Sequence, residues 1–236
     1  WVGLKNYQTI FQDEGFLHAF WYTALFALVS LLIINVLAFA VAYVLTKGIK
    51  GSNIFRTVFF MPNLIGGIVL GYIWLMIFDG ILSNFDTAVV LETKYGFWGL
   101  IILMCWQQIG YMMIIYIAGL QAIPEDMLEA AKIDGANRWQ QLIKITLPSI
   151  VPTIVIMLIL EAGKVLNIGF EKVYAMQTDL NLSVSEVIST YTYKIGLEDL
   201  EYDYATAIGL FNSVVSFVLL LLVNGISKKV SQTSLF

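Results

Sequence analysis

The chain has 236 residues, of which 59% are hydrophobic and 13% charged, and its mean hydropathy is +0.81. Soluble domains are about 45–50% apolar and about 25% charged, so the composition excludes an ordinary soluble protein. The apolar residues come in long blocks rather than in alternation, which favours membrane-spanning helices over a transmembrane barrel. The formal charge of −4 becomes informative only when it is divided between the two sides of a membrane.

Five apolar segments are long enough to cross about 30 Å of hydrocarbon, which takes about 20 residues of helix. We expect spans at about 19–46, 57–78, 97–120, 149–169 and 204–226. These spans and their loops make one transmembrane domain over 19–227, preceded by an amphipathic segment at 1–18 that suits the external membrane surface. The expected fold class is an all-α integral membrane protein, a polytopic helical bundle. Because the chain starts at Trp1 without an initiator Met, we expect a further helix ahead of it, which would give six spans in the intact protein.

Basic residues predict which loops face the cytoplasm. The loop 47–56, the segment 121–148 and the tail 228–236 carry eight Lys and Arg residues together. The opposite loops carry four basic and twelve acidic residues. Because a basic excess marks the cytoplasmic side, we expect 121–148 and the C-terminus inside and the segments 79–96 and 170–203 outside.

Residues 121–148 are a polar, mixed-charge segment within an apolar chain. Pro124-Glu125-Asp126 opens a helix well, because Pro tolerates an early position and acids favour the positive end of the helix dipole. Gly135 predicts a left-handed cap. A second short helix is expected over 137–145, and Leu147-Pro148 is expected to turn the chain back into the membrane.

The same segment holds seven residues in a fixed register: Glu129, Ala130, Ala131, Gly135, Ile145, Leu147 and Pro148. A Glu-Ala-Ala-x-x-x-Gly match alone describes many helix ends, and an amphipathic loop helix without a special role is the alternative interpretation. The whole register resembles the EAA loop of permease subunits of binding-protein-dependent ABC importers. Ile133-Asp134-Gly135-Ala136 extends the match in the form seen in the sugar-importing branch.

Other stretches carry the same resemblance. Residues 2–7 are similar to the segment after the first helix of such permeases, and residues 118–124 to the lead-in to their EAA loop. Residues 181–191 and 207–213 resemble permeases for the uptake of polysaccharides or complex oligosaccharides.

The resemblance implies the type I ABC importer permease fold in a bacterial cytoplasmic membrane. It implies two cytoplasmic ATPase subunits that bind ATP and Mg²⁺, a second permease that is usually a different chain, and an extracellular binding protein that delivers the sugar. The coupling residues that it implies are Glu129, Ala130, Ala131, Asp134, Gly135, Ile145, Leu147 and Pro148. The membrane lipid is the remaining partner, and no nucleic acid is expected.

The chain itself carries no nucleotide-binding loop, because Gly163-Lys164-Val165 lacks both the upstream glycine and the hydroxyl residue of that motif. A single histidine, His18, and a single cysteine, Cys105, cannot make a metal site. We therefore expect no catalytic residue, cofactor or metal in this subunit.

Charged residues inside a span usually face a cavity or a partner. Glu161 and Lys164 stand at i and i+3 in the span 149–169, so they are expected to share a helix face, which Asn167 continues. They are either a structural ion pair at the interface with a second permease or a polar wall of the substrate path. Gln107 and Tyr111, at i and i+4, are a second candidate path surface.

Asn212 in the last span is the remaining candidate for the path. Two further functions stay open. One is a secondary transporter or channel that works without ATP, in which Glu161 and Lys164 would serve an ion-coupled cycle. The other is a membrane scaffold without a path of its own. Co-purification with an ATPase, and uptake that stops when ATP hydrolysis is blocked, would separate them.

Overall fold

The computed structural model describes residues 2–88, 93–164 and 166–231, and every regular element among them is a helix. Five of these helices are long and apolar enough to cross a membrane: Glu14–Leu45, Gly67–Phe85, Tyr95–Gln121, Arg138–Ala162 and Tyr202–Lys229. The predicted all-α polytopic fold class is therefore confirmed. Residues 89–92 of the expected external segment 79–96, and 232–236 of the expected tail, lie outside the described residues.

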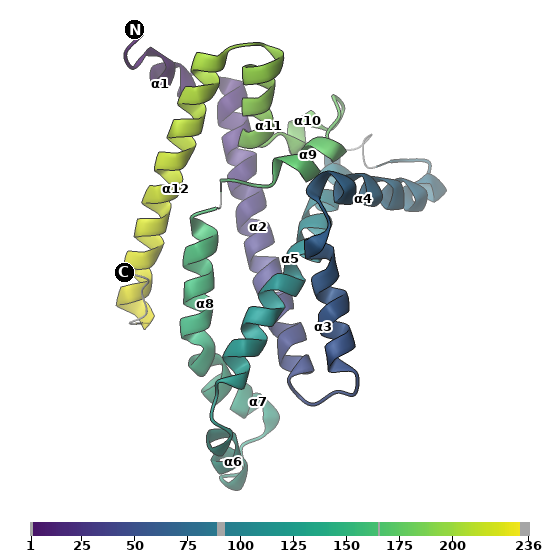
Figure 1. The fold of residues 1–236 in the computed structure, drawn as a ribbon, viewed down its shortest axis with the longest axis vertical. Coiled ribbons are helices and arrows are strands. Elements are labelled where there is room, and N and C mark those ends of the chain that lie inside the picture. The colour runs from purple at the N-terminus through teal and green to yellow at the C-terminus, as the bar shows by residue number, and fades with distance from the viewer. Residues whose placement is uncertain (1, 89–92, 165, 232–236) are drawn as a thin grey trace.

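Helices α2 (Glu14–Leu45) and α5 (Thr93–Gln121) pack along each other in the centre of the bundle (Figure 1). Small residues of α2 such as Ala38 and Ala42 are buried in the same core as large residues of α5, and the rings of Phe26 and Phe97 stack with their centroids 4.5 Å apart. The Tyr116 hydroxyl on α5 donates a hydrogen bond to the Asn35 side chain on α2. Close packing of this kind holds membrane helices together, because lipid tails are as apolar as the side chains.

The predicted span 57–78 differs from the structure in its bounds: two helices occupy it, and the apolar span begins only at Gly67. Helix α3 (Ser52–Phe60) ends in a 3₁₀ turn at Met61–Leu64, and α4 (Gly67–Leu82) then leaves sharply sideways (Figure 1). Pro62 lacks the N–H that an α-helix needs, and Ile65 and Gly66 have extended backbones with ψ of 132° and 142°. The Phe59 carbonyl, just before this break, lies against Gly110 of α5.

The predicted span 149–169 differs from the structure at both ends. Helix α8 (Leu147–Ala162) is continuous with α7 (Arg138–Gln141) through a π-helical turn at Leu142–Thr146, so Leu147-Pro148 does not turn the chain. Pro148 stands in the first turn of α8, directly after the π turn, where the N–H that proline lacks is least needed. At the other end α8 stops at Ala162, and the chain runs without a helix to α9 (Phe170–Met176).

The remaining elements gather at two ends of the bundle. Helices α1 (Lys5–Ile10), α10 (Leu182–Ser185) and α11 (Ile188–Tyr193) lie at the end opposite to α6 (Glu125–Ile133) (Figure 1). A π-helical turn at Lys194–Glu198 leads to α12 (Tyr202–Ser231), which packs against α8, and Ser83–Phe85 forms a 3₁₀ turn after α4.

Asp13 ties the start of α2 to two distant helices. Its Oδ1 caps α2 by accepting from the backbone N–H groups of Gly15 at 2.9 Å and Phe16 at 3.3 Å. Its Oδ2 accepts from the hydroxyl of Tyr204 at 2.6 Å and from that of Tyr191. Burial would raise the pKa of Asp13, but these hydrogen bonds to the charged form outweigh it and hold that pKa below its ordinary value.

A substitution of Asp13 should therefore destabilise the fold. Asp13→Ala removes the cap and both tyrosine contacts, and we expect a loss of about 1 kcal/mol or more, the usual value of an N-cap. Asp13→Asn keeps an accepting oxygen and should lose less. The folded pKa lies below the unfolded value of about 3.9, so the charge-linked stability is present at neutral pH and disappears as the pH falls below about 4.

Thermal unfolding of the detergent-solubilised protein at pH about 7 and about 3 measures this linkage. The difference in Tm between wild type and Asp13→Asn should shrink at the lower pH. An equal difference at both pH values would contradict the role of the Asp13 charge.

The contact between α5 and the break after α3 leaves no space for a side chain. A Cβ on Gly110 would overlap the backbone carbonyl of Phe59. We expect Gly110→Ala to destabilise the protein by about 1–3 kcal/mol, because backbone has to move. Gly225→Ala is the matched control, since a Cβ there meets nothing within 4 Å. Equal Tm values for the two variants would contradict this close contact.

Candidate coupling surface and transport cavity

Helix α6 ends in the left-handed glycine cap that the sequence predicts. Gly135 has a φ of +79°, a conformation that L side chains rarely adopt. The N–H of Ala136 donates to the carbonyl of Ala131 at 2.9 Å, and the N–H of Gly135 donates to that of Lys132 at 3.1 Å. These two bonds form a Schellman motif, which stops α6 and turns the chain towards α7.

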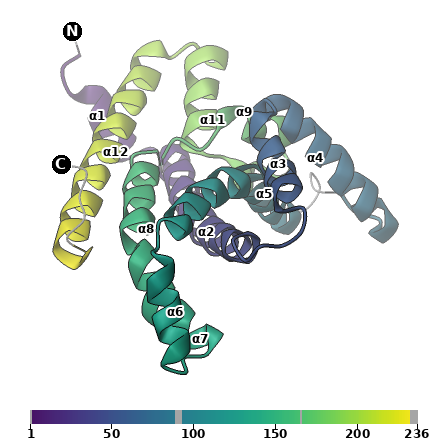
Figure 2. The ribbon, with the colours of Figure 1, turned by 60° about the horizontal axis from the view of Figure 1, so that its bottom comes forward.

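Helix α7 begins with a capping box. The side chain of Asn137 accepts from the N–H of Gln140 at 2.9 Å, and the side chain of Gln140 accepts from the N–H of Asn137 at 2.8 Å. The two short helices thus meet at a corner with a defined geometry. The corner projects beyond the bundle (Figure 2).

Large apolar side chains on this corner face outwards. Ile133 is 86% exposed and Trp139 is 67% exposed, and Met127 and Ile143 are exposed as well. We call these four residues the corner patch. Trp139 was not among the residues selected from the sequence, although a tryptophan between Arg138 and Gln140 on a polar surface helix is a usable signal. A membrane protein that keeps such residues in an aqueous loop has an apolar contact surface there.

The residues of the EAA register occupy the same corner and the start of α8. Glu129 and Ala130 are exposed on α6, and Ala131 is half-buried beside them. Asp134 is the C-terminal cap residue of α6, next to Gly135. Ile145 lies in the π-helical turn, and Leu147 and Pro148 open α8. The register therefore covers both α6 and the joint through which α7 continues into α8.

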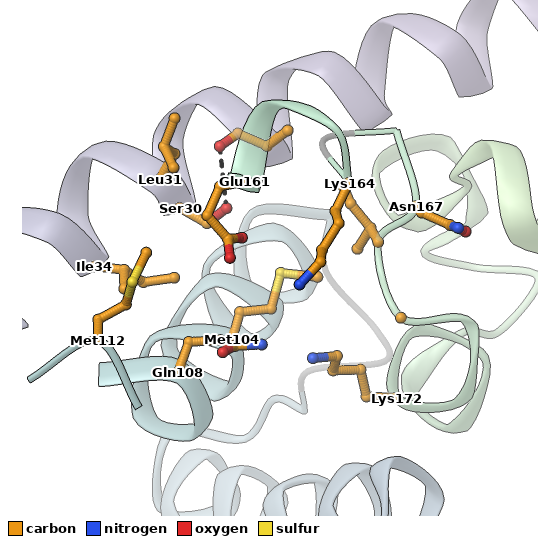
Figure 3. Close-up of a pocket in the computed structure, with 13 residues that line it drawn as sticks. Ser30, Leu31, Ile34, Met104, Gln108, Met112, Glu161, Lys164, Asn167 and Lys172 are labelled. Carbon is orange, nitrogen blue, oxygen red and sulfur yellow. Dashed lines mark hydrogen bonds between the residues drawn. The ribbon is translucent and has the colours of Figure 1, made fainter. Parts of the chain in front are cut away.

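A cavity of about 150 Å³ lies between α2, α5, the end of α8 and the start of α9 (Figure 3). We call it the central cavity. Its polar lining residues are Ser30, Gln108, Glu161, Lys164, Asn167 and Lys172. Met104 and Met112 line it between these polar groups. The sequence therefore identified three of its polar residues, Glu161, Lys164 and Asn167.

Lys172 is the functional candidate that the sequence interpretation missed. It was counted only as a basic residue of the external segment 170–203, but its side chain is 8% exposed. Its Nζ donates a hydrogen bond to Oε1 of Gln107 at 2.6 Å. Burial lowers the pKa of Lys172 to about 8, which Glu171 partly offsets. The sequence carries one sign of this burial: Lys172 stands next to the apolar residues Val173, Ala175 and Met176 in the same short helix.

Glu161 and Lys164 do not share a helix face as predicted, because α8 ends at Ala162 and Lys164 lies beyond it. The N–H of Lys164 donates to the carbonyl of Glu161 at 3.0 Å, which belongs to the last turn. Both side chains point into the central cavity (Figure 3). The two side chains form no ion pair with each other in the described part of the structure, so it does not support the interpretation as a preformed ion pair.

The other candidate path residues are divided between different places. Gln107 is buried behind the central cavity, where it holds Lys172. Asn212 lines a second cavity of about 480 Å³, and Asn167 lines both cavities, so the two adjoin. The Asn212 Oδ1 is buried without a hydrogen-bond partner. Tyr111 lines neither cavity.

Comparison with known proteins identifies the chain. The family described as "Binding-protein-dependent transport system inner membrane component" matches residues 34–232. The chain belongs to this family. The permease is thus a membrane component of an ABC importer, as the EAA register predicts, and not the ATPase. Among the described residues, no group of three or more His, Cys, Asp or Glu side chains could hold a metal ion.

Two curated relatives show how far the similarity extends. The permease is 34% identical to the "Probable starch degradation products transport system permease protein AmyD" of Thermoanaerobacterium thermosulfurigenes, over 98% of this chain and 80% of that protein. It is 30% identical to the "Polygalacturonan/rhamnogalacturonan transport system permease protein YteP" of Bacillus subtilis strain 168, over 100% of this chain and 77% of that protein.

A solved structure confirms the type I importer fold. The permease matches a chain of the bacterial alginate ABC transporter, crystallised with its periplasmic protein bound to an alginate pentasaccharide. The TM-score is 0.91 at 29% identity, and the match covers 99% of this chain and 85% of the other.

Proposed function

We propose that this permease imports an oligosaccharide that an extracellular binding protein delivers, and that ATP hydrolysis in a partner ATPase drives the import. The capped α6–α7 corner is the observation that carries this proposal, because it presents the EAA register and an exposed apolar patch together. The carbohydrate class is supported by the relatives, whose names concern starch degradation products, polygalacturonan and alginate.

The corner is the proposed docking site for the ATPase, which would hold ATP and Mg²⁺. Its surface fits a groove on a partner: the corner patch supplies apolar contact area, and the small side chains of Ala130 and Ala131 allow close backbone approach. Glu129 offers an exposed carboxylate beside them. Basic residues in 47–56 and 121–148 make this end the proposed cytoplasmic end.

The continuity of α7 with α8 offers a mechanical route from the ATPase to the cavity. A force on the corner acts on α7, passes the π-helical turn at Leu142–Thr146 and reaches α8. Glu161, in the last turn of α8, and Lys164 just beyond it line the central cavity. A rigid movement of α8 would thereby displace two charged groups of the path.

The substrate path is proposed to include the central cavity and the adjoining cavity that Asn212 lines. The central cavity, at about 150 Å³, is smaller than the roughly 300–1,000 Å³ of ligand pockets. An oligosaccharide therefore requires that it widens, which fits an alternating path between two permeases. Membership of the binding-protein-dependent family disfavours ion-coupled transport without ATP.

Loss of the apolar contact should uncouple the ATPase. We expect Ile133→Asp and Trp139→Ala to lower the affinity for the ATPase about tenfold or more, because apolar anchors dominate such interfaces. ATP-dependent sugar uptake should fall in parallel. Co-purification of the ATPase with tagged permease, and uptake into proteoliposomes that contain the whole importer, measure the two effects.

Leu4→Asp is the matched control, since Leu4 is an exposed apolar residue. Leu4 is the N-cap of α1, which lies at the end of the bundle opposite to α6 (Figure 1). The control substitution should leave co-purification and uptake unchanged. Normal ATPase binding by Ile133→Asp would contradict the docking site. Uptake that continues when ATP hydrolysis is blocked would contradict the ABC mechanism itself.

A further inference from the structure

Lys172 presents a buried amine whose direct hydrogen-bond partner is uncharged. Its Nζ is bonded to the neutral amide of Gln107, and among the described residues no carboxylate forms an ion pair with it. The neighbouring Glu171 is exposed, and its side chain lies against Gly67 of α4. A buried charge is unfavourable unless an opposite charge accompanies it, so this amine is suited to bind an anion that enters the cavity.

Counted together with Lys172, the described lining of the central cavity carries one more positive than negative charge. The ammonium groups of Lys164 and Lys172 approach it from two sides (Figure 3). Among the described residues that line it, Glu161 is the one acid. Gln108 and Asn167 add amide groups. A neutral saccharide would satisfy the amides and leave one ammonium group without an anion. A carboxylate on the saccharide would supply the anion for this ammonium group.

The fold holds Lys172 in place from both sides. A Cβ on Gly169 would lie 2.7 Å from Cε of Lys172, so the lysine stem rests directly on that glycine. A Cβ on Gly71 of α4 would lie 3.2 Å from the Lys172 carbonyl and 2.7 Å from the Cβ of Ala175. The close contact of α4 with α9 therefore fixes the helix, and the amine is positioned before a ligand arrives.

We propose that Lys172, together with Lys164, binds the carboxylate of an acidic saccharide in the central cavity, so that the transported oligosaccharide contains uronate units. This proposal rests on the proposed function and narrows its substrate class. Glu161 repels a second carboxylate close to the first. The Glu161 carboxylate can accept hydrogen bonds from the hydroxyl groups of the same sugar.

The test is equilibrium binding of trigalacturonate to the complete importer without its binding protein. The fully methyl-esterified trisaccharide serves as a neutral probe of nearly the same shape. The wild-type importer should bind the acid about tenfold or more tightly than the ester, since an ammonium–carboxylate hydrogen bond is stronger than a neutral one. Lys172→Met should remove this preference by weakening the acid alone, and Lys172→Arg should retain most of it.

Lys50→Met is the matched control, because Lys50 is an exposed lysine in the loop between α2 and α3. It should change neither affinity. The proposal is overturned if wild type binds both probes equally or neither, or if Lys172→Met weakens both probes by the same factor. If one of these outcomes is found and the importer still takes up neutral maltotriose with ATP, the proposed function stands and only the preference for an acidic saccharide is wrong. If the complete importer takes up no saccharide at all, the proposed function is overturned as well.

Discussion

Close contact between helix backbones is the constraint on which the rest of the permease depends. Lipid offers no hydrophobic drive to bring spans together, so the helices associate where small residues let them approach. Gly110 receives the Phe59 carbonyl, and Gly71 receives α9 at Ala175. The first contact fixes the break between α3 and α4 against α5. The second fixes Lys172 at the central cavity, so both the shape of the bundle and the chemistry of the path follow from these contacts.

The same bundle separates two tasks. The α6–α7 corner lies outside the bundle and is stabilised locally by its glycine cap and its capping box. The central cavity lies within the bundle and is assembled from α2, α5, α8 and α9. Helix α8 belongs to both, because it continues from α7 and carries Glu161 in its last turn, just before Lys164. A permease that converts an event at its surface into a change in its path requires such a shared element.

The sequence predicted best what depends on local interactions. The end of α6 at Gly135 follows from the conformational freedom of one glycine, and the start of α7 follows from one Asn and one Gln. The predicted helix bounds differ from the structure where they rest on hydropathy alone, because hydropathy does not show where the backbone leaves the helical conformation. The apolar segment 57–78 has the composition of one span, but Pro62, Ile65 and Gly66 break it. Lys164 was placed on a helix face because apolarity continues after α8 has ended at Ala162.

The sequence by itself determined the membrane class, the family and the place of the EAA register, because composition, charge bias and a contiguous motif are readable without contacts. Only the tertiary structure decided which polar groups meet. Lys172 stands in a segment that is acidic and external by composition, and its burial arises when α9 packs on Gly71 of α4 and its amine reaches Gln107 of α5. Such a meeting joins residues 65 positions apart, and no local pattern encodes it.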